Sequence, residues 1–220
     1  MKEKITEKVK AHTRYKNKDG KIVPGVTTIT GILGKPALVK WANNLGLKGI
    51  DSTKYVDEKA SCGTLAHLMV ECECKGTEPS FDDYTGNQIK VATVSFKKFI
   101  DWRFKNDFTI IKSELQLVSE VYQFGGCCDI YAMLNGKKTL LDVKTSKGIF
   151  SEMKTQVGGG YKILLEENGY EVEDVRILRL GRDEDEGFED KQVSKLDLHK
   201  KKFIYCREIY EINKQLRGKE

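Results

Sequence analysis

Apolar and polar positions in the middle of the chain follow a pattern that predicts a meandering sheet. Short apolar or β-branched runs, which are typical of strands, lie at 109–118, 121–125, 128–134, 139–144 and 172–180. Between the third and fourth runs stands NGKK (Asn135 to Lys138). Asn-Gly favours the tight turn that joins antiparallel strands, so these two runs are predicted to form a hairpin.

Helical periodicity surrounds these strands. Apolar residues recur at steps of three and four in segments that are therefore predicted to be helices: 55–74, 86–105, 153–167 and 196–216. Ahead of them, residues 14–23 are predicted to form a short hairpin. Thr27 or Thr28 is predicted to cap a helix, and Pro36 to begin another.

The order of these elements predicts a mixed α/β fold in a single domain. A length of 220 residues suffices for one sizeable core. A helical region is expected at about 26–105, followed at about 106–220 by a core in which helices flank a central, mostly antiparallel or mixed sheet. No apolar run approaches the length of a membrane span, so no membrane partner is expected.

Composition and charge change this picture little. The formal net charge is +5, and the excess of base lies at the two ends: residues 1–22 hold eight Lys or Arg against three acids, and residues 191–220 hold nine against four. Basic ends are compatible with a polyanionic ligand, but charge alone favours an ordinary solvated surface. The start, MKEKITEKVK, lacks the apolar stretch of a signal peptide. Six cysteines without zinc-type spacing then indicate free thiols in a reducing cytoplasm.

Candidate chemistry lies on the two strands of the predicted hairpin. Asp129 is on the first strand, and Asp142 and Lys144 are on the second, two positions apart and therefore on one face. A carboxylate and a lysine inside an apolar strand are costly unless they meet partners or a metal ion. Mg²⁺ takes carboxylate oxygens and keeps waters, and the carbonyl of Val143 could add a ligand. The pattern suggests a metal-dependent nuclease. A buried ion pair, or an edge strand whose polar face is exposed to solvent, would explain the same residues.

Further acidic and imidazole groups give weaker signals. His67 and Glu71 lie four apart on one predicted helix face, where they could bind a metal or only hydrogen-bond to each other. Glu114 and Glu120 could each add a ligand, but exposed strand glutamates are commoner.

Glycines inside predicted helices indicate close approach of another element. Gly63 has no side chain to keep a neighbour such as the sheet at a distance. Gly158 to Gly160 would cost a helix roughly 1 kcal/mol each. They indicate either close approach of the backbone to a nucleic-acid strand or to the sheet, or a loop before a helix that starts near Tyr161; both interpretations stay open.

These motifs resemble the PD-(D/E)XK nuclease superfamily, specifically its RecB-type branch with phage and mitochondrial-genome-maintenance exonucleases. The core motif is Asp129 followed by Asp142-Val143-Lys144, and a GTxxH-like helix is matched by GTLAH, which ends at His67. The segment PGVTTI (24–29), followed by Trp41, is also similar to that branch. The resemblance spans most of the chain.

Two other features of the branch are matched differently. Its Gln-x-x-x-Tyr element begins at Gln156, but Gly160 stands at the tyrosine position and Tyr161 comes one residue late. Some relatives hold an iron–sulfur cluster with three cysteines after the core. This sequence has only Cys206 there, so no cluster is expected.

The resemblance implies a restriction-endonuclease-like core and a Mg²⁺- or Mn²⁺-dependent deoxyribonuclease. It favours an exonuclease that hydrolyses linear DNA ends in phage-type recombination, replication or DNA processing. It assigns metal binding to His67, Asp129, Asp142 and Val143, catalysis to Asp129, Asp142, Lys144 and Gln156, and DNA contacts to Gln156, Tyr161, Thr145 and Ser146.

Alternative functions stay open at this point. A structure-selective endonuclease would carry the same motifs, and a non-catalytic DNA-binding or assembly protein could use a decayed nuclease fold, although Asp129, Asp142 and Lys144 are intact. The expected partner is linear duplex or single-stranded DNA, with a single-strand annealing protein as a candidate second partner. The expected location is cytoplasmic, in the host cytoplasm if a phage encodes the protein. The oligomeric state stays open.

Overall fold

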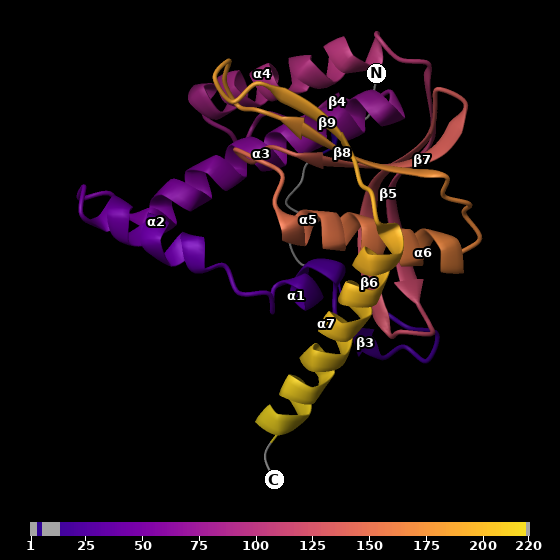
Figure 1. The fold of residues 1–220 in the computed structure, drawn as a ribbon. Coiled ribbons are helices and arrows are strands. Elements are labelled where there is room, and N and C mark those ends of the chain that lie inside the picture. Colours follow the sequence, from indigo (N-terminus) through magenta and orange to yellow (C-terminus); the bar gives the residue numbers. More distant parts are fainter. Residues whose placement is uncertain (1–3, 6–13, 219–220) are drawn as a thin grey trace.

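The computed structural model describes residues 4–5 and 14–218, and a five-stranded sheet in the order β5-β6-β7-β8-β9 forms its centre (Figure 1). The strands are β5 (Phe108–Ser119), β6 (Phe124–Leu134), β7 (Lys137–Lys144), β8 (Asp174–Leu180) and β9 (Phe188–Gln192). β5, β6 and β7 are antiparallel neighbours, β8 pairs with β7 in parallel, and β9 returns antiparallel. The mixed sheet with flanking helices confirms the predicted fold class.

The predicted hairpin between β6 and β7 turns at Asn135 and Gly136. Their φ angles are +49° and +79°, as a two-residue turn of this kind requires at both central positions. The register pairs Leu134 with Lys137 and continues to Ile130 with Leu141. The tight turn therefore fixes which residues of β6 face which residues of β7.

One face of the sheet is covered by two long helices, α3 (Ser52–Lys75) and α4 (Gly86–Arg103). Phe99 and Trp102 of α4 and Val70 of α3 pack with Ile130 and Leu141 of the sheet in one core cluster. Figure 1 shows both helices on the same side of the strands. Their predicted bounds were nearly right, and Gly76 ends α3 in the left-handed conformation, with φ +66°.

The other face is covered by α1 (Val26–Thr30), α5 (Ser151–Thr155), the π-helix η2 (Gln156–Tyr161), α6 (Lys162–Glu167) and α7 (Leu196–Arg217). Their apolar side chains join Cys128, Leu140 and Ile177 in a second core cluster. α5, η2 and α6 follow one another without a break, so the segment predicted to be helical at 153–167 is helical, and the alternative of a loop before Tyr161 is excluded.

Shorter elements complete the structure. A hairpin of β2 (Tyr15–Lys16) and β3 (Ile22–Val23) lies where predicted, β1 (Lys4–Ile5) pairs with β4 (Glu78–Pro79), and α2 (Pro36–Gly46) begins at its proline. Tyr15 packs on Gly125: a Cβ at Gly125 would lie 2.3 Å from Cγ of Tyr15, so only glycine allows this contact.

Some predictions about these elements were wrong. α1 begins after Gly25 without a side-chain cap, so neither Thr27 nor Thr28 caps it. Val121 lies in the turn between β5 and β6 rather than in a strand, and β9 was not predicted.

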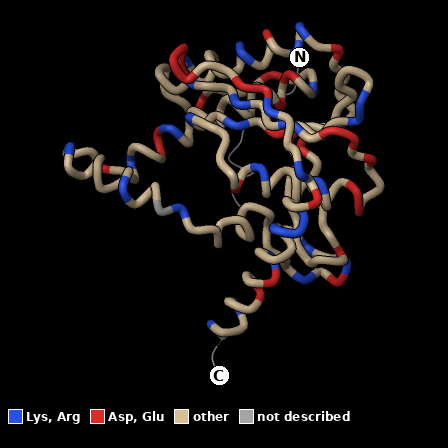
Figure 2. The backbone as a smooth tube through the Cα atoms, in the orientation of Figure 1, with Lys and Arg blue, Asp and Glu red and all other residues tan. Residues whose placement is uncertain are grey.

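Basic and acidic residues are interspersed along the described backbone, as Figure 2 shows. The described part of the chain excludes residues 1–3 and 6–13, so half of the basic N-terminal segment, residues 1–22, lies outside it. No helix among the described residues is long and apolar enough to cross a membrane.

Candidate active site

The candidate site lies where β6 and β7 separate. Their backbone pairing stops at Ile130 and Leu141. Just beyond, a side chain replaces the missing pairing: Oδ2 of Asp129 accepts a hydrogen bond from the backbone N–H of Val143 at 2.8 Å. The Asp129 carboxylate thus lies between the diverging strands, next to the segment that carries Asp142 and Lys144.

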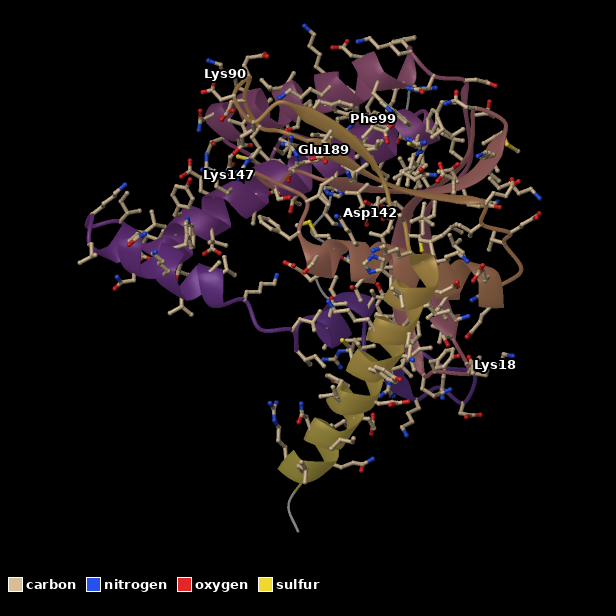
Figure 3. The ribbon with its side chains drawn as sticks, in the orientation of Figure 1. Lys18, Lys90, Phe99, Asp142, Lys147 and Glu189 are labelled. Atoms are coloured by element: carbon tan, nitrogen blue, oxygen red, sulfur yellow. The ribbon has the colours of Figure 1, made fainter. Side chains whose placement is uncertain are left out.

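Asp142 and Lys144 share a face of β7, as the two-residue spacing predicts, and form an ion pair through Oδ2 of Asp142. The side chain of Asp142 is 1% exposed and that of Lys144 is 18% exposed. Figure 3 shows Asp142 in the interior, between the sheet and α5. Apart from this contact with the Lys144 ammonium, neither oxygen of Asp142 accepts a hydrogen bond from the described residues. A buried carboxylate in this state is costly unless a further cation joins it.

The protonation states follow from this burial. Burial raises the pKa of Asp142 from 3.8 to about 6, with the charge of Lys144 opposing the change and that of Asp129 adding to it. Burial alone would lower the pKa of Lys144, but the negative charges of Asp142 and Asp129 outweigh it and raise that pKa. Lys144 therefore stays protonated, whereas the pKa of Asp142 lies closer to neutral pH than that of an ordinary aspartate.

Helix α3 reaches the same place from the other face of the sheet. Nδ1 of His67 lies 3.6 Å from Oδ2 of Asp129. The crossing is close because position 63 is glycine: a Cβ there would lie 2.6 Å from Oγ1 of Thr145, just after β7. The predicted close approach at Gly63 is thus to the end of a sheet strand. Glu71, one turn after His67, is buried and ion-paired with Lys75 at 2.6 Å.

A hollow of about 370 Å³ opens at this crossing, walled by Ala60, Gly63, Thr64, His67, Glu114, Asp129 and Thr145. Glu114 lies opposite Asp129, between the pairs Ser113–Ile130 and Leu115–Cys128, with φ +52°. Few non-glycine residues adopt this left-handed backbone, and such irregularities in strands are common beside active sites. The sequence did not distinguish Glu114 from Glu120, which instead accepts a hydrogen bond from the backbone N–H of Lys18.

The π-helix brings Gln156 and Tyr161 together although they are five positions apart, one more than in a Gln-x-x-x-Tyr pattern. Its hydrogen bonds join residues five apart, so positions 156 and 161 align on one face as positions four apart do in an α-helix. Nε2 of Gln156 donates a hydrogen bond to Oη of Tyr161 at 2.8 Å. Burial, and after it the negative charges of Asp142 and Asp129, raises the pKa of Tyr161 well above its usual value.

The three glycines inside η2 let other helices approach. A Cβ at Gly159 would lie 2.6 Å from the carbonyl oxygen of His199 on α7, and one at Gly160 would lie 2.6 Å from Cγ1 of Val26 on α1. The close approach at Gly159 and Gly160 is therefore to α7 and α1, and at Gly158 it is to Val193, in the segment between β9 and α7, at 2.9 Å from the Cβ position. Ser146, a predicted DNA contact, donates its hydroxyl to the carbonyl of Gly148 at 2.8 Å within its own loop.

The donor groups suit a hard divalent cation. No group of three or more His, Cys, Asp and Glu side chains among residues 4–5 and 14–218 is arranged so that it could hold a metal ion. Mg²⁺ does not need such a group, since it is usually held by one or two carboxylates and keeps several waters. Asp129, Asp142, His67 and the carbonyl of Val143 are the candidate ligands, and the buried oxygens of Asp142 fit that use.

Comparison with known proteins adds no family. No family model matches the chain, and the search of curated proteins found no match. The functional assignment therefore depends on the geometry of this site.

Proposed function

We propose that the chain is a Mg²⁺- or Mn²⁺-dependent deoxyribonuclease of the PD-(D/E)XK kind, acting as an exonuclease on linear DNA ends. The observation that carries the proposal is the buried Asp142 carboxylate, whose oxygens have no polar partner among the described residues apart from the ion pair with Lys144, at the point where Asp129 fills the gap between β6 and β7. A stabilising ion pair alone gives no reason for a buried carboxylate with no other polar partner among the described residues, or for the hollow beside Asp129.

The residues of the site have different roles in the proposed reaction. A divalent cation held by Asp129, Asp142, His67 and the Val143 carbonyl would polarise the phosphodiester and lower the pKa of a water. Lys144 stays cationic and can donate to the phosphate oxygen on which negative charge develops.

Gln156 and Thr145 are suited to hold the strand. Gln156 is oriented by Tyr161, and Thr145 forms part of the wall of the hollow. Each can hydrogen-bond to a phosphate or sugar oxygen and so place the phosphodiester against the site.

The direct test compares linear duplex DNA with closed circular DNA, with Mg²⁺, with Mn²⁺ and with EDTA. We expect the linear DNA to shorten from its ends and the circle to persist, with no reaction in EDTA. Cutting of the circle would identify an endonuclease instead. DNA binding without cleavage in either metal would favour the non-catalytic alternative and overturn the proposal.

A further inference from the structure

Two further hollows continue the active-site hollow toward the end of α7. The first, of about 500 Å³, shares Glu114 with the active-site hollow and lies between the β2–β3 hairpin and the start of α1. The second, of about 680 Å³, shares Thr28 and Tyr210 with the first and extends to Lys214 and Arg217. Because neighbouring hollows share wall residues, the three lie in a row on the surface, and the two beyond the active-site hollow are here named the α1–α7 track.

Charge along the track favours an anionic occupant. Arg14 lines the first hollow, and Lys214 and Arg217 line the second; all three are exposed. Apart from Glu114 at the active-site end, no acidic residue is among the described residues that line these two hollows. Glu211, on the same helix, is ion-paired with Arg207 at 3.0 Å and does not line the track.

The uncharged walls favour a chain of nucleotides over a simple anion. Tyr15 and Tyr210 are half-buried aromatic residues in the first hollow, and Thr27, Thr28 and Gln116 add exposed hydrogen-bonding groups there. Grooves that combine backbone cations with aromatic side chains bind single-stranded nucleic acid without reading its sequence.

We infer that the α1–α7 track binds a single DNA strand that continues from the phosphodiester in the active site. This inference rests on the proposed function and specifies the form of its substrate. The three cations follow one another along the track, as the phosphates of one strand do. From Tyr210 to Arg217, α7 rises about 10 Å at about 1.5 Å per residue. That length accommodates about three phosphates of a stacked strand, at about 3.4 Å each.

The test measures binding of fluorescent oligothymidylates of about 3 to about 12 nucleotides, a range near the site sizes of known single-strand grooves. EDTA prevents cleavage, and fluorescence anisotropy gives the affinity at several salt concentrations. The full chain is compared with the double variant Lys214→Gln/Arg217→Gln. Its matched control is Lys200→Gln/Lys201→Gln, which removes two charges from the same helix at a separate hollow.

Loss of two phosphate contacts should lower the salt slope by about 1.4, at about 0.7 per contact on single strands. That change corresponds to about 25-fold weaker binding at 0.1 M salt if binding at 1 M is unchanged. We expect the loss for the longer oligomers and not for the shortest, which cannot span both ends of the track. The control should match the wild-type protein, and thermal unfolding should show that both variants fold.

Several results would contradict the inference that the track binds a single DNA strand. These are equal slopes for all three proteins, equal losses in the track variant and the control, no binding by the wild-type protein, or an equal loss of slope on blunt duplex of the same length. Failure of the nuclease is distinguishable. If the proteins bind with the expected slopes but cut no DNA, the inference about the track stands and the proposed nuclease activity fails. If the proteins cut DNA but the slopes are unchanged in the track variant, the nuclease activity stands and the inference about the track fails.

Discussion

Two buried aspartates on neighbouring strands of the sheet have opposite surroundings. Asp142 of β7 is 1% exposed and Asp174 of β8 is 5% exposed. Asp174 accepts hydrogen bonds from the backbone of Val175 at 2.9 Å, from Arg176 at 2.7 Å and from Gln192 at 2.8 Å. Apart from its contact with Lys144, Asp142 accepts none from the described residues.

The pKa values of the two carboxyls record this difference. Burial would raise both, but hydrogen bonds from Arg176 and Gln192 outweigh it and lower the pKa of Asp174. For Asp142 burial prevails, and the pKa rises to about 6. The same residue type therefore favours ionisation at one place and opposes it at the other.

The Asp174 network stabilises an edge of the sheet. Arg176 also donates to Asp190 of β9 at 3.0 Å, and Asp190 accepts from Nε1 of Trp102 on α4 at 2.9 Å. These bonds tie β9 to β8 and to α4. Nothing comparable surrounds Asp142, so the comparison separates a carboxylate that serves stability from one that is suited to bind a cation. Polar groups that break the packing rules tend to mark functional sites.

The largest expected effect comes from replacing each aspartate with asparagine. Asp142→Asn should reduce Mg²⁺-dependent cleavage on the order of 10³-fold, because the neutral amide cannot balance the charge of the ion. Asp174→Asn should leave cleavage nearly unchanged and lower the free energy of unfolding by about 1–3 kcal/mol, because it disrupts a satisfied buried network. Single-turnover rates and chemical unfolding measure both. An Asp142→Asn protein that cuts DNA at the wild-type rate would refute the metal assignment.

The next largest effect concerns Lys144. Lys144→Ala should lower the single-turnover rate about 100-fold with little change in DNA affinity, because the ammonium acts mainly on charge that develops in the transition state. Lys138→Ala is the matched control, since Lys138 lies on the same strand but is ion-paired with Glu171 at the far end. If Lys144→Ala weakened DNA binding while the rate stayed constant, Lys144 would be a phosphate contact only.

A substitution that touches neither aspartate should still disturb the Asp142 site. Gly63→Ala places a Cβ 2.6 Å from Oγ1 of Thr145, so either Thr145 or α3, which carries His67, must shift. We expect a roughly 10- to 100-fold loss of rate, since displacements near 1 Å can have this effect, with no loss of helix propensity.

Thr145→Ala provides the rescue. It removes Oγ1 and leaves Cβ of Thr145 at 3.8 Å from the new methyl group, an ordinary contact. The double variant should therefore be as active as Thr145→Ala alone. Failure of this rescue would show that Gly63 matters for another reason.

The pH dependence of cleavage should report Asp142. The carboxyl must ionise to hold the cation, so at limiting Mg²⁺ the rate should rise about tenfold per pH unit up to about 6 and then level off. Higher Mg²⁺ should move the midpoint to lower pH, because the cation competes with the proton. Initial rates at several Mg²⁺ concentrations test this, and a midpoint that did not move would assign the titration to another group.

Stability should depend on pH with opposite signs at the two aspartates. The raised pKa of Asp142 gives a contribution that is present in acid and is lost as pH rises from 3.8 to about 6. The lowered pKa of Asp174 gives one that is present above 3.8 and is lost as pH falls through the folded-state value. The unfolding free energy of each asparagine variant should be compared with that of the wild type across this pH range. As pH rises, the two differences should change in opposite directions.

Local sequence signals could predict most of the fold. The Asn-Gly turn, Pro36 and Gly76 act through the backbone of their own neighbours, and helical periodicity is visible within one segment. β9 was missed because FEDKQ has no apolar alternation and pairs with β8 through its backbone at the sheet edge.

The site could be predicted only in part. The common face of Asp142 and Lys144 follows from strand geometry, whereas the position of Asp129 depends on where β6 and β7 part. The left-handed backbone of Glu114 has no signal in its own sequence, because glutamate rarely adopts it. Both features depend on contacts between strands, which a single sequence does not record.

The smallest expected effect concerns the π-helix. The sequence alone could not explain the spacing of five positions between Gln156 and Tyr161. Tyr161→Phe keeps the buried ring but removes the hydroxyl that accepts from Gln156. Loss of one hydrogen bond worth about 0.5–1.5 kcal/mol should slow cleavage about 2- to 12-fold. Tyr131→Phe is the matched control, because the Tyr131 hydroxyl donates to the carbonyl of Glu171 at 2.6 Å, away from the site.

If Tyr161 orients Gln156, Gln156→Ala should slow cleavage more than Tyr161→Phe does, and adding Tyr161→Phe to Gln156→Ala should slow it no further. Additive losses in that double variant would show that the two residues act independently and that the π-helix aligns them without functional consequence.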